Sequence, residues 1–353
     1  MMIRGPVSWE MGSFFVHIAL LFVIEMDEGG LDVRRNIIMA VLFLAGMMVI
    51  VPYMIVDTNG RIRAESEMTI RVWLHEQGRI EEMSMTDYLI GAVSAEMPAA
   101  FEEEALRVQA VAARTYAMQQ MAAYGGSGYN GADISTDHRV HQAYMNEEQC
   151  REKWGVEYER YHAKVRRAVE STAGEVAVYD GSLIRALYHS TCGGRTASSA
   201  EVWGRAVPYL VSVQCDWDAQ APRRQEVQRV AIDEVADKLG IEAAVMTAGA
   251  DGSETVQVIA RTESGRIESV RIGEKTYAGS DVRAKLGLRS TNFTAHTESD
   301  SLVFTTIGYG HGAGLCQYGA DGMAKAGYSY RDILAHYYQG IDIIPLTKVK
   351  RIS

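Results

Sequence analysis

The chain lacks an excess of basic side chains. Among its 353 residues, 35 lysines and arginines stand against 45 aspartates and glutamates, which gives a formal net charge of −10. Nucleic-acid binding requires clustered positive charge, so this balance argues against a nucleic-acid partner. It also argues against simple electrostatic adhesion to an anionic polymer. The length suffices for one large domain or two smaller ones with a hydrophobic core.

Cysteines are few, and they lack the Cys-x-x-Cys spacing of zinc ribbons. The four are Cys150, Cys192, Cys215 and Cys316. In an oxidising compartment Cys192 and Cys215 can pair, but no feature of the sequence shows that they do, and buried free thiols are the favoured interpretation. We expect no cofactor and no bound metal.

One long stretch, Ile37–Val56, carries no charge and as a helix is about 30 Å long, enough to cross a bilayer. Arg34 and Arg35 precede it and Asp57 follows it, so the positive-inside rule predicts a cytoplasmic N-terminus and an extracytoplasmic remainder. A buried core helix and a cleaved signal peptide are the alternatives. Because a small-x-small cleavage site is not clear after Pro52, we predict an uncleaved, single-pass anchor in the cell membrane.

Composition predicts the remaining boundaries. Two interpretations of residues 1–25 stay open, a true N-terminal segment and an upstream mis-start, because Met26 begins a stretch of acids and then arginines that is typical of a true start. Residues 216–300 are more charged and poorer in glycine motifs, which indicates an inserted subdomain. The predicted segments are a cytoplasmic N-terminal segment 1–36, a linker 57–68, an extracytoplasmic domain 69–346 and a basic C-terminal tail 347–353.

Hydrophobic periodicity predicts an α+β domain of mixed helices and short antiparallel sheets. The predicted helices are 86–95, Glu102–Ala123, Glu147–Thr172, Glu226–Leu239, Asp281–Leu286, Gln317–Ala326 and Tyr330–Tyr338. The predicted strands are Met68–Leu74, Arg79–Met83, Val176–Tyr179, Ile184–Tyr188, Thr255–Ala260, Ile267–Ile272 and Leu302–Gly308. Asp180-Gly181 and Ser264-Gly265 are expected hairpin turns.

A single acid stands in the run Ser94-Ala95-Glu96-Met97-Pro98, at the end of the first predicted helix. The negative end of the helix dipole and burial beside apolar neighbours both raise the pKa of a carboxyl. A carboxyl that keeps its proton near neutral pH is a general acid. The alternative is an ordinary surface glutamate at a helix end.

Three stretches in this order carry a family resemblance: Asp87–Ala117, Tyr188–Trp203 and Gly308–Ala324, followed by Tyr337-Tyr338. They resemble the stage II sporulation protein D family of membrane-anchored lytic transglycosylases. The resemblance implies a mixed α+β body with a long substrate groove. It also implies cleavage of peptidoglycan glycan strands, stripped of peptides, between N-acetylmuramic acid and N-acetylglucosamine. The implied partners are stage II sporulation proteins P and M, at the mother-cell membrane facing the forespore during engulfment.

By the same resemblance, Glu96 stands at the family's catalytic position. There a single acid protonates the glycosidic oxygen and then takes the proton of the C6 hydroxyl, which closes a 1,6-anhydro ring without an attacking water. The resemblance implies a substrate-binding set of Arg114, Gln142, Ser190, Tyr209, His311, Gln317 and Tyr318. Structural alternatives stay open for Arg114, as partner of a buried glutamate, and for His311, as a tie between its loop and the closing helix.

Two alternatives to a metal-free enzyme are a zinc-binding protein and a non-catalytic scaffold. Some relatives carry zinc in the pattern Asp-x-Cys followed by His-Cys-Gln, but residues 133–135 read Asp-Ile-Ser and residues 140–142 read Val-His-Gln. Only His138 and His141 remain there, a weak signal, so zinc is not expected at these residues. The second interpretation is a non-catalytic glycan-binding scaffold that enhances a partner amidase.

Overall fold

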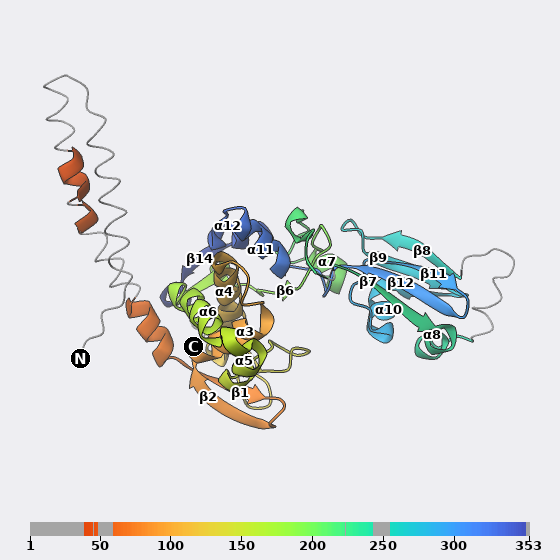
Figure 1. Cartoon of the computed structure of the whole chain (residues 1–353), viewed down its shortest axis with the longest axis horizontal. Helices are drawn as coiled ribbons and strands as arrows, with labels where there is room; N and C mark the ends of the chain where they lie inside the picture. Colours follow the sequence, from red (N-terminus) through yellow and green to blue (C-terminus); the bar gives the residue numbers. More distant parts are fainter. Residues whose placement is uncertain (1–38, 45, 49–58, 223, 243–254, 351–353) are drawn as a thin grey trace, which may run out of the picture. The chain divides into compact units, whose positions relative to one another are not determined.

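A computed structural model describes residues 39–44, 46–48, 59–222, 224–242 and 255–350 (Figure 1). The chain divides into two compact units, residues 1–61 and 62–353. In the described part of the chain, no helix combines the length and the apolar character needed to cross a membrane. Residues 39–44 and 46–48 are helical, but the rest of the predicted anchor and residues 1–25 lie outside the described residues. The anchor therefore stays a prediction.

The second unit mixes helices with short sheets, which confirms the α+β prediction. We call residues 62–222 and 308–350 the main lobe and residues 225–307 the second lobe. The strands of the main lobe are β1 (Thr69–Leu74), β2 (Arg79–Ser84), β3 (Ile134–Ser135), β4 (Glu175–Tyr179), β5 (Ser182–Leu183), β6 (Tyr188–His189), β13 (Leu315–Cys316) and β14 (Asp342–Pro345). Its α-helices are α3 (Met85–Glu96), α4 (Glu103–Gln120), α5 (Glu147–Trp154), α6 (Tyr158–Ser171), α7 (Ser199–Trp203), α11 (Gln317–Lys325) and α12 (Tyr330–Tyr337), and its short 3-10 turns include η3 (Asp216–Asp218).

Helix α3 has sequence-encoded ends that fix the place of Glu96. It begins after Ser84, whose hydroxyl accepts a hydrogen bond from the backbone N–H of Asp87 at 3.0 Å. The predicted start of this helix, Thr86, lies one residue inside it, because Ser84 supplies the cap. Met97 is extended, with φ −128° and ψ 139°, as expected for a residue before proline. Glu96 is therefore the last helical residue.

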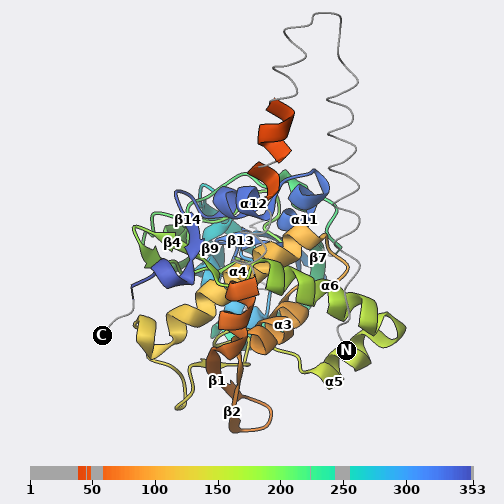
Figure 2. The same cartoon turned by 90° about the vertical axis from the view of Figure 1, so that its left-hand side faces the viewer.

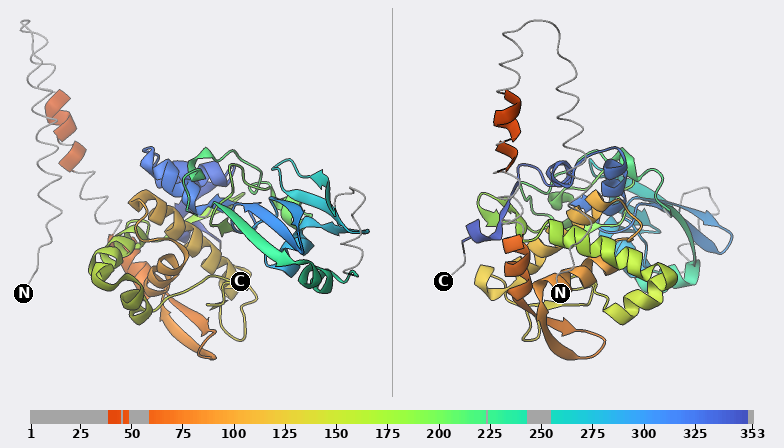
Figure 3. Two further views of the ribbon diagram at one scale, coloured as in Figure 1. Left: turned by 45° about the vertical axis from the view of Figure 1, so that its right-hand side comes forward. Right: turned by 60° about the vertical axis from the view of Figure 1, so that its left-hand side comes forward.

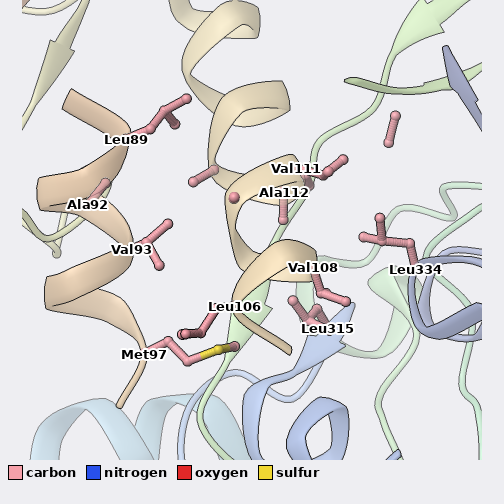
Figure 4. Packing of buried hydrophobic residues seen from close by; sticks show 14 of the residues in the cluster. Leu89, Ala92, Val93, Met97, Leu106, Val108, Val111, Ala112, Leu315 and Leu334 are labelled. Carbon is pink, nitrogen blue, oxygen red and sulfur yellow. The ribbon is translucent and has the colours of Figure 1, made fainter. Parts of the chain in front are cut away.

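The core of the main lobe forms where α3 and α4 pack together, with α6 against both (Figure 2). Small alanines on α4 allow this close approach, and the long apolar side chains fill the space between the helices. The close-up labels Leu89, Ala92, Val93 and Met97 of α3, Leu106, Val108, Val111 and Ala112 of α4, and Leu315 and Leu334 from the end of the chain (Figure 4). The helix that carries Glu96 is thus anchored on a largely buried partner.

Predicted helix Glu147–Thr172 is interrupted in the structure. It divides into α5 and α6 at Gly155, which has a φ of +52°, a backbone conformation that glycine adopts at little cost. The predicted helix Glu102–Ala123 is confirmed as α4, which is shorter at both ends and spans Glu103–Gln120.

In its described residues, the second lobe contains two three-stranded antiparallel sheets and two helices (Figure 3). Its elements are β7 (Gln225–Ala231), α8 (Ile232–Leu239), β8 (Val256–Arg261), β9 (Ile267–Ile272), β10 (Lys275–Ala278), α10 (Gly279–Leu286), β11 (Phe293–Glu298) and β12 (Ser301–Ile307). The hairpin of β8 and β9 is confirmed. The prediction of one helix over Glu226–Leu239 is wrong in its first half, because β7 pairs along its whole length with β12.

Candidate active site

The Glu96 carboxyl lies half-buried at the C-terminal end of α3. Its Oε1 accepts a hydrogen bond from the backbone N–H of Ala143 at 2.6 Å. The Tyr188 side chain makes a second hydrogen bond to the carboxyl. The carboxyl is therefore held in place by two donors from chain segments distant in sequence.

A chain of hydrogen bonds runs from α3 through Gln142 to this carboxyl. The Tyr88 hydroxyl donates to Gln142 Oε1 at 2.9 Å, and Gln142 Nε2 donates to the Tyr188 hydroxyl oxygen at 3.0 Å. Because Tyr188 accepts from Gln142, its own proton is free to go to Glu96. Gln142, a predicted substrate-binding residue, thus contacts the site through the two tyrosines.

Burial raises the pKa of Glu96 to about 7, while the hydrogen bonds from Ala143 and Tyr188 oppose the shift. Burial raises the pKa values of Tyr88 and Tyr188 well above their ordinary range, and the negative charge of Glu96 adds to both shifts. The pKa of Tyr116 is also raised by burial. A carboxyl that titrates near neutrality therefore lies among hydroxyls that stay neutral.

Two of the predicted binding residues lie at the start of α11. Gln317 is buried, and its Nε2 donates to the backbone carbonyl of Glu96 at 2.9 Å and to Gln109 Oε1 at 3.2 Å. It holds the end of α3 in place. The Tyr318 ring packs edge-on against Phe101, with centroids 4.8 Å apart.

The second and third sequence motifs meet as a parallel strand pair. β6 pairs with β13, with Leu315 opposite Tyr188 and Cys316 opposite His189. The backbone N–H of Tyr318 donates to the carbonyl of Ser190, which is half-buried two residues beyond Tyr188. This pairing brings Gln317, Tyr188 and Ser190 into one neighbourhood.

His311 contacts the backbone of Tyr188. Its Nδ1 accepts from the backbone N–H of Ala313 at 3.1 Å, and its ring also hydrogen-bonds the backbone of Tyr188. Burial lowers the pKa of His311 to about 4, so the imidazole is neutral at pH 7. These hydrogen bonds tie the loop of His311 to β6, whereas the open alternative placed the tie at the closing helix, and the substrate-binding role of His311 stays a prediction.

The structure corrects the predicted role of Arg114. Its side chain is fully buried, and its Nη2 contacts Glu65 Oε1 at 3.1 Å and the carbonyl of Val169 at 3.1 Å. Its Nη1 donates to the carbonyl of Glu175 at 3.2 Å. A guanidinium enclosed in this way does not reach a bound glycan, so Arg114 is a structural residue.

The Tyr209 side chain contacts Arg185 and Tyr179. Its hydroxyl accepts from the backbone N–H of Arg185 at 2.9 Å, and its ring lies 5.5 Å from that of Tyr179. Arg185 in turn lowers the pKa of Tyr116 by its positive charge. Tyr209 therefore stays a proposed groove residue, linked to the site through the segment that it holds.

Sequence reasoning missed Tyr88, Tyr188 and Tyr116 and the amide of Ala143. Tyr88 stands eight positions before Glu96 on the same helix, about 2.2 turns away, so helical spacing alone leaves the two side chains roughly 80° apart around the axis. Tyr188 is the first residue of the second motif, and Ala143 follows Gln142. These positions give a signal in the sequence, but the hydrogen-bond chain itself depends on the tertiary fold.

Comparisons with known proteins identify the family of this chain. The family model described as Stage II sporulation protein matches residues 74–179. Stage II sporulation protein D of Bacillus amyloliquefaciens is 36% identical over 79% of this chain and 79% of that protein. Its counterpart in Bacillus subtilis is 35% identical with the same coverage. A protein named amidase enhancer from Bacillus subtilis is 29% identical over 71% of this chain and 39% of its own length. The chain therefore belongs to the stage II sporulation protein D family.

Proposed function

We propose that this protein is a peptidoglycan lytic transglycosylase in which Glu96 is the single general acid and base. The observation that carries the proposal is a half-buried carboxyl with a pKa of about 7, held by a backbone amide and a tyrosine. A carboxyl with such a pKa can donate and accept a proton at neutral pH.

In the proposed reaction, the Glu96 proton goes to the oxygen that joins C1 of N-acetylmuramic acid to N-acetylglucosamine. The C1–O bond breaks, and its electron pair leaves with the N-acetylglucosamine oxygen. The C6 hydroxyl of the muramic acid then attacks C1 and returns its proton to Glu96. The products balance without water, because the new 1,6-anhydro bond replaces the broken one.

The surroundings of Glu96 suit this mechanism. Between the two proton transfers the carboxylate is anionic, and the amide of Ala143 and the Tyr188 hydroxyl are donors already aimed at it. Glycosidases that use water or a covalent intermediate require a second carboxyl across the scissile bond. The described groups around Glu96 are instead neutral tyrosines and an amide, so an intramolecular nucleophile fits this site better.

We further propose that Ile37–Val56 anchors the enzyme in the cell membrane with its catalytic domain on the extracytoplasmic side. The length and lack of charge of that segment support this placement. The family implies work in engulfment beside stage II sporulation proteins P and M. A partner that removes peptides supplies the stripped strands that the proposed activity consumes.

The test is an assay of the purified full-length chain on peptide-stripped glycan strands. We expect 1,6-anhydro-muramic ends from the wild type, and a loss of at least about 10³-fold in Glu96→Gln, which cannot donate a proton. Glu82→Gln on β2, an exposed glutamate, is the matched control and should keep full activity. Products that end in a free reducing sugar, or an active Glu96→Gln, would refute the mechanism.

A second candidate function is a glycan-binding scaffold that enhances a partner amidase. The similarity to a protein named amidase enhancer supports it. The same assay separates the two functions: strand binding without anhydro products, together with faster amidase turnover, supports the scaffold.

A further inference from the structure

A second cluster of reactive side chains lies apart from Glu96. The Sγ atoms of Cys192, Cys215 and Cys316 and a carboxylate oxygen of Asp218 all lie within 4.8 Å of one another. These four side chains are buried, with at most 1% of any of them exposed. An aspartate in such a place requires compensation, and thiols are weak hydrogen-bond donors. Three thiol sulfurs and a carboxylate oxygen gathered this closely are a set of potential metal ligands.

We propose that these four residues bind one zinc ion in a structural site. With Zn–S near 2.3 Å and Zn–O near 2.1 Å, tetrahedral ligand atoms lie roughly 3.6 to 3.8 Å apart. Asp218 Oδ2 is 3.3 Å from Cys192 Sγ and 3.9 Å from Cys316 Sγ, which brackets that spacing. Three soft sulfurs and one oxygen in a closed, buried site favour zinc over magnesium or calcium, which prefer oxygen ligands.

The outer hydrogen bonds orient the proposed ligands. The Tyr337 hydroxyl lies 3.1 Å from Cys215 Sγ, and the backbone N–H of Gly319 donates to Cys316 Sγ at 3.3 Å. Such second-layer donors stabilise thiolates and fix the direction of their lone pairs. These contacts support a site built for ligand atoms that carry negative charge.

Asp218 receives the same support from two other donors. The backbone N–H of Gly193 donates to Oδ2 at 2.7 Å, and Arg224 Nε donates to Oδ1 at 3.3 Å. Three thiolates and a carboxylate around Zn²⁺ leave a net charge of −2. Two nearby arginines offset this negative charge. Arg224 contacts Asp218, and Arg266 Nη2 donates to the carbonyl of Cys192 at 3.0 Å.

The proposed zinc joins three segments that are far apart in the chain. Cys192 follows β6, Cys215 and Asp218 precede and end the turn η3, and Cys316 ends β13 and caps α11. Gln317, the next residue, holds the carbonyl of Glu96. The ion therefore stabilises the junction on which the start of α11 depends, whatever chemistry Glu96 performs.

The first experiment measures metal in the full-length chain, purified without an affinity tag or chelator. Elemental analysis should find one zinc per chain in the wild type and a loss of nearly all of it in Cys316→Ser and Asp218→Asn. Cys150→Ser is the matched control, because Cys150 is a buried cysteine on α5, outside the cluster, and it should keep the zinc.

The second experiment uses the wild type, so that a variant that fails to fold does not decide the result. Chelation should lower the melting temperature, and added zinc should restore it. Cobalt substitution should give the intense thiolate-to-metal absorption of a sulfur-rich tetrahedral site. Absence of zinc, zinc that persists in Cys316→Ser, or a disulfide between any two of the three cysteines would overturn the proposal.

Discussion

The two lobes of residues 62–353 differ in how they accommodate charged groups. In the main lobe, Arg114 and Glu65 form an ion pair with 0% and 4% of their side chains exposed. In the second lobe, Arg229 and Glu298 form a pair with 54% and 51% exposed. Buried charges cost stability unless their surroundings satisfy them, so a lobe that keeps several is organised around them. The buried cation of the second lobe, Arg266, finds its carbonyl partners in the main lobe, at Arg195 and Cys192.

The attachment itself is polar and partly buried. Arg266, on the turn before β9, donates through Nη1 to the carbonyl of Arg195 at 3.1 Å, and the backbone N–H of Ser264 donates to Glu201 Oε1 at 2.9 Å. The residues of the predicted site all lie in the main lobe: Glu96, Arg114, Gln142, Ser190, Tyr209, His311, Gln317 and Tyr318. Substitutions in matched pairs, one in each lobe, can test this division.

The largest expected effect is on the buried ion pair. Arg114→Met leaves Glu65 without its partner and should lower the free energy of unfolding by about 3–5 kcal/mol. Arg229→Met should cost no more than about 1 kcal/mol, because its pair is exposed to solvent. Urea unfolding followed by circular dichroism measures both. Equal losses in the two variants would contradict the proposed contrast between the lobes.

The next effect is a dependence of stability on pH that belongs to Glu96. Its pKa is about 7 in the folded protein against an ordinary 4.5, so the folded state holds the proton more tightly. Below about pH 4.5 Glu96 is protonated in both the folded and the unfolded state, so its burial does not lower the stability through ionisation. Between about pH 4.5 and 7 Glu96 ionises in the unfolded state but not yet in the folded state, so the stability of the fold falls. Above about pH 7 the stability stays lower by the full free energy of the pKa difference.

Glu96→Gln removes this ionisation. The variant should therefore gain stability relative to wild type as the pH rises, on the order of 2–3 kcal/mol by pH 8, with little difference at pH 4. The facing groups Tyr88, Tyr116 and Tyr188 do not ionise in this range, since burial raises the pKa of each. Melting curves across pH provide the measurement, with Glu82→Gln as the control. A pH-independent difference would show that Glu96 is not the group responsible.

Much of the fold could be predicted from local signals. Pro98 and the apolar period of residues 86–95 predict the helix that ends at Glu96, and Asp- and Gly-containing turns predict the hairpins. The helix over Glu226–Leu239 is mispredicted in part, because the choice between helix and strand at β7 depends on its partner β12, which lies about 75 residues further along the chain.

The candidate site was predictable only in part, for a similar reason. A motif can indicate that Arg114 is required, but only burial beside Glu65 shows that the requirement is structural. Likewise, no local pattern joins Cys192, Cys215 and Cys316 to Asp218, because they meet through the pairing of β6 with β13 and the turn η3. Tertiary contacts decide both cases.

The smallest effect concerns a single hydroxyl in each lobe. Tyr188→Phe removes a donor to the Glu96 carboxylate, and because that hydrogen bond lowers the pKa of Glu96, its loss should raise the pKa further. We expect kcat/KM on glycan strands to fall about 10- to 100-fold, and the alkaline limb of the pH–rate profile to move to higher pH. Tyr277→Phe in the second lobe removes a hydroxyl that donates to the carbonyl of Leu239 at 3.1 Å, and it should leave both quantities unchanged. A fall in rate without a shift of the alkaline limb would mean that Tyr188 acts by packing alone. The hydrogen-bond chain from Tyr88 through Gln142 would then have no effect on the pKa of Glu96.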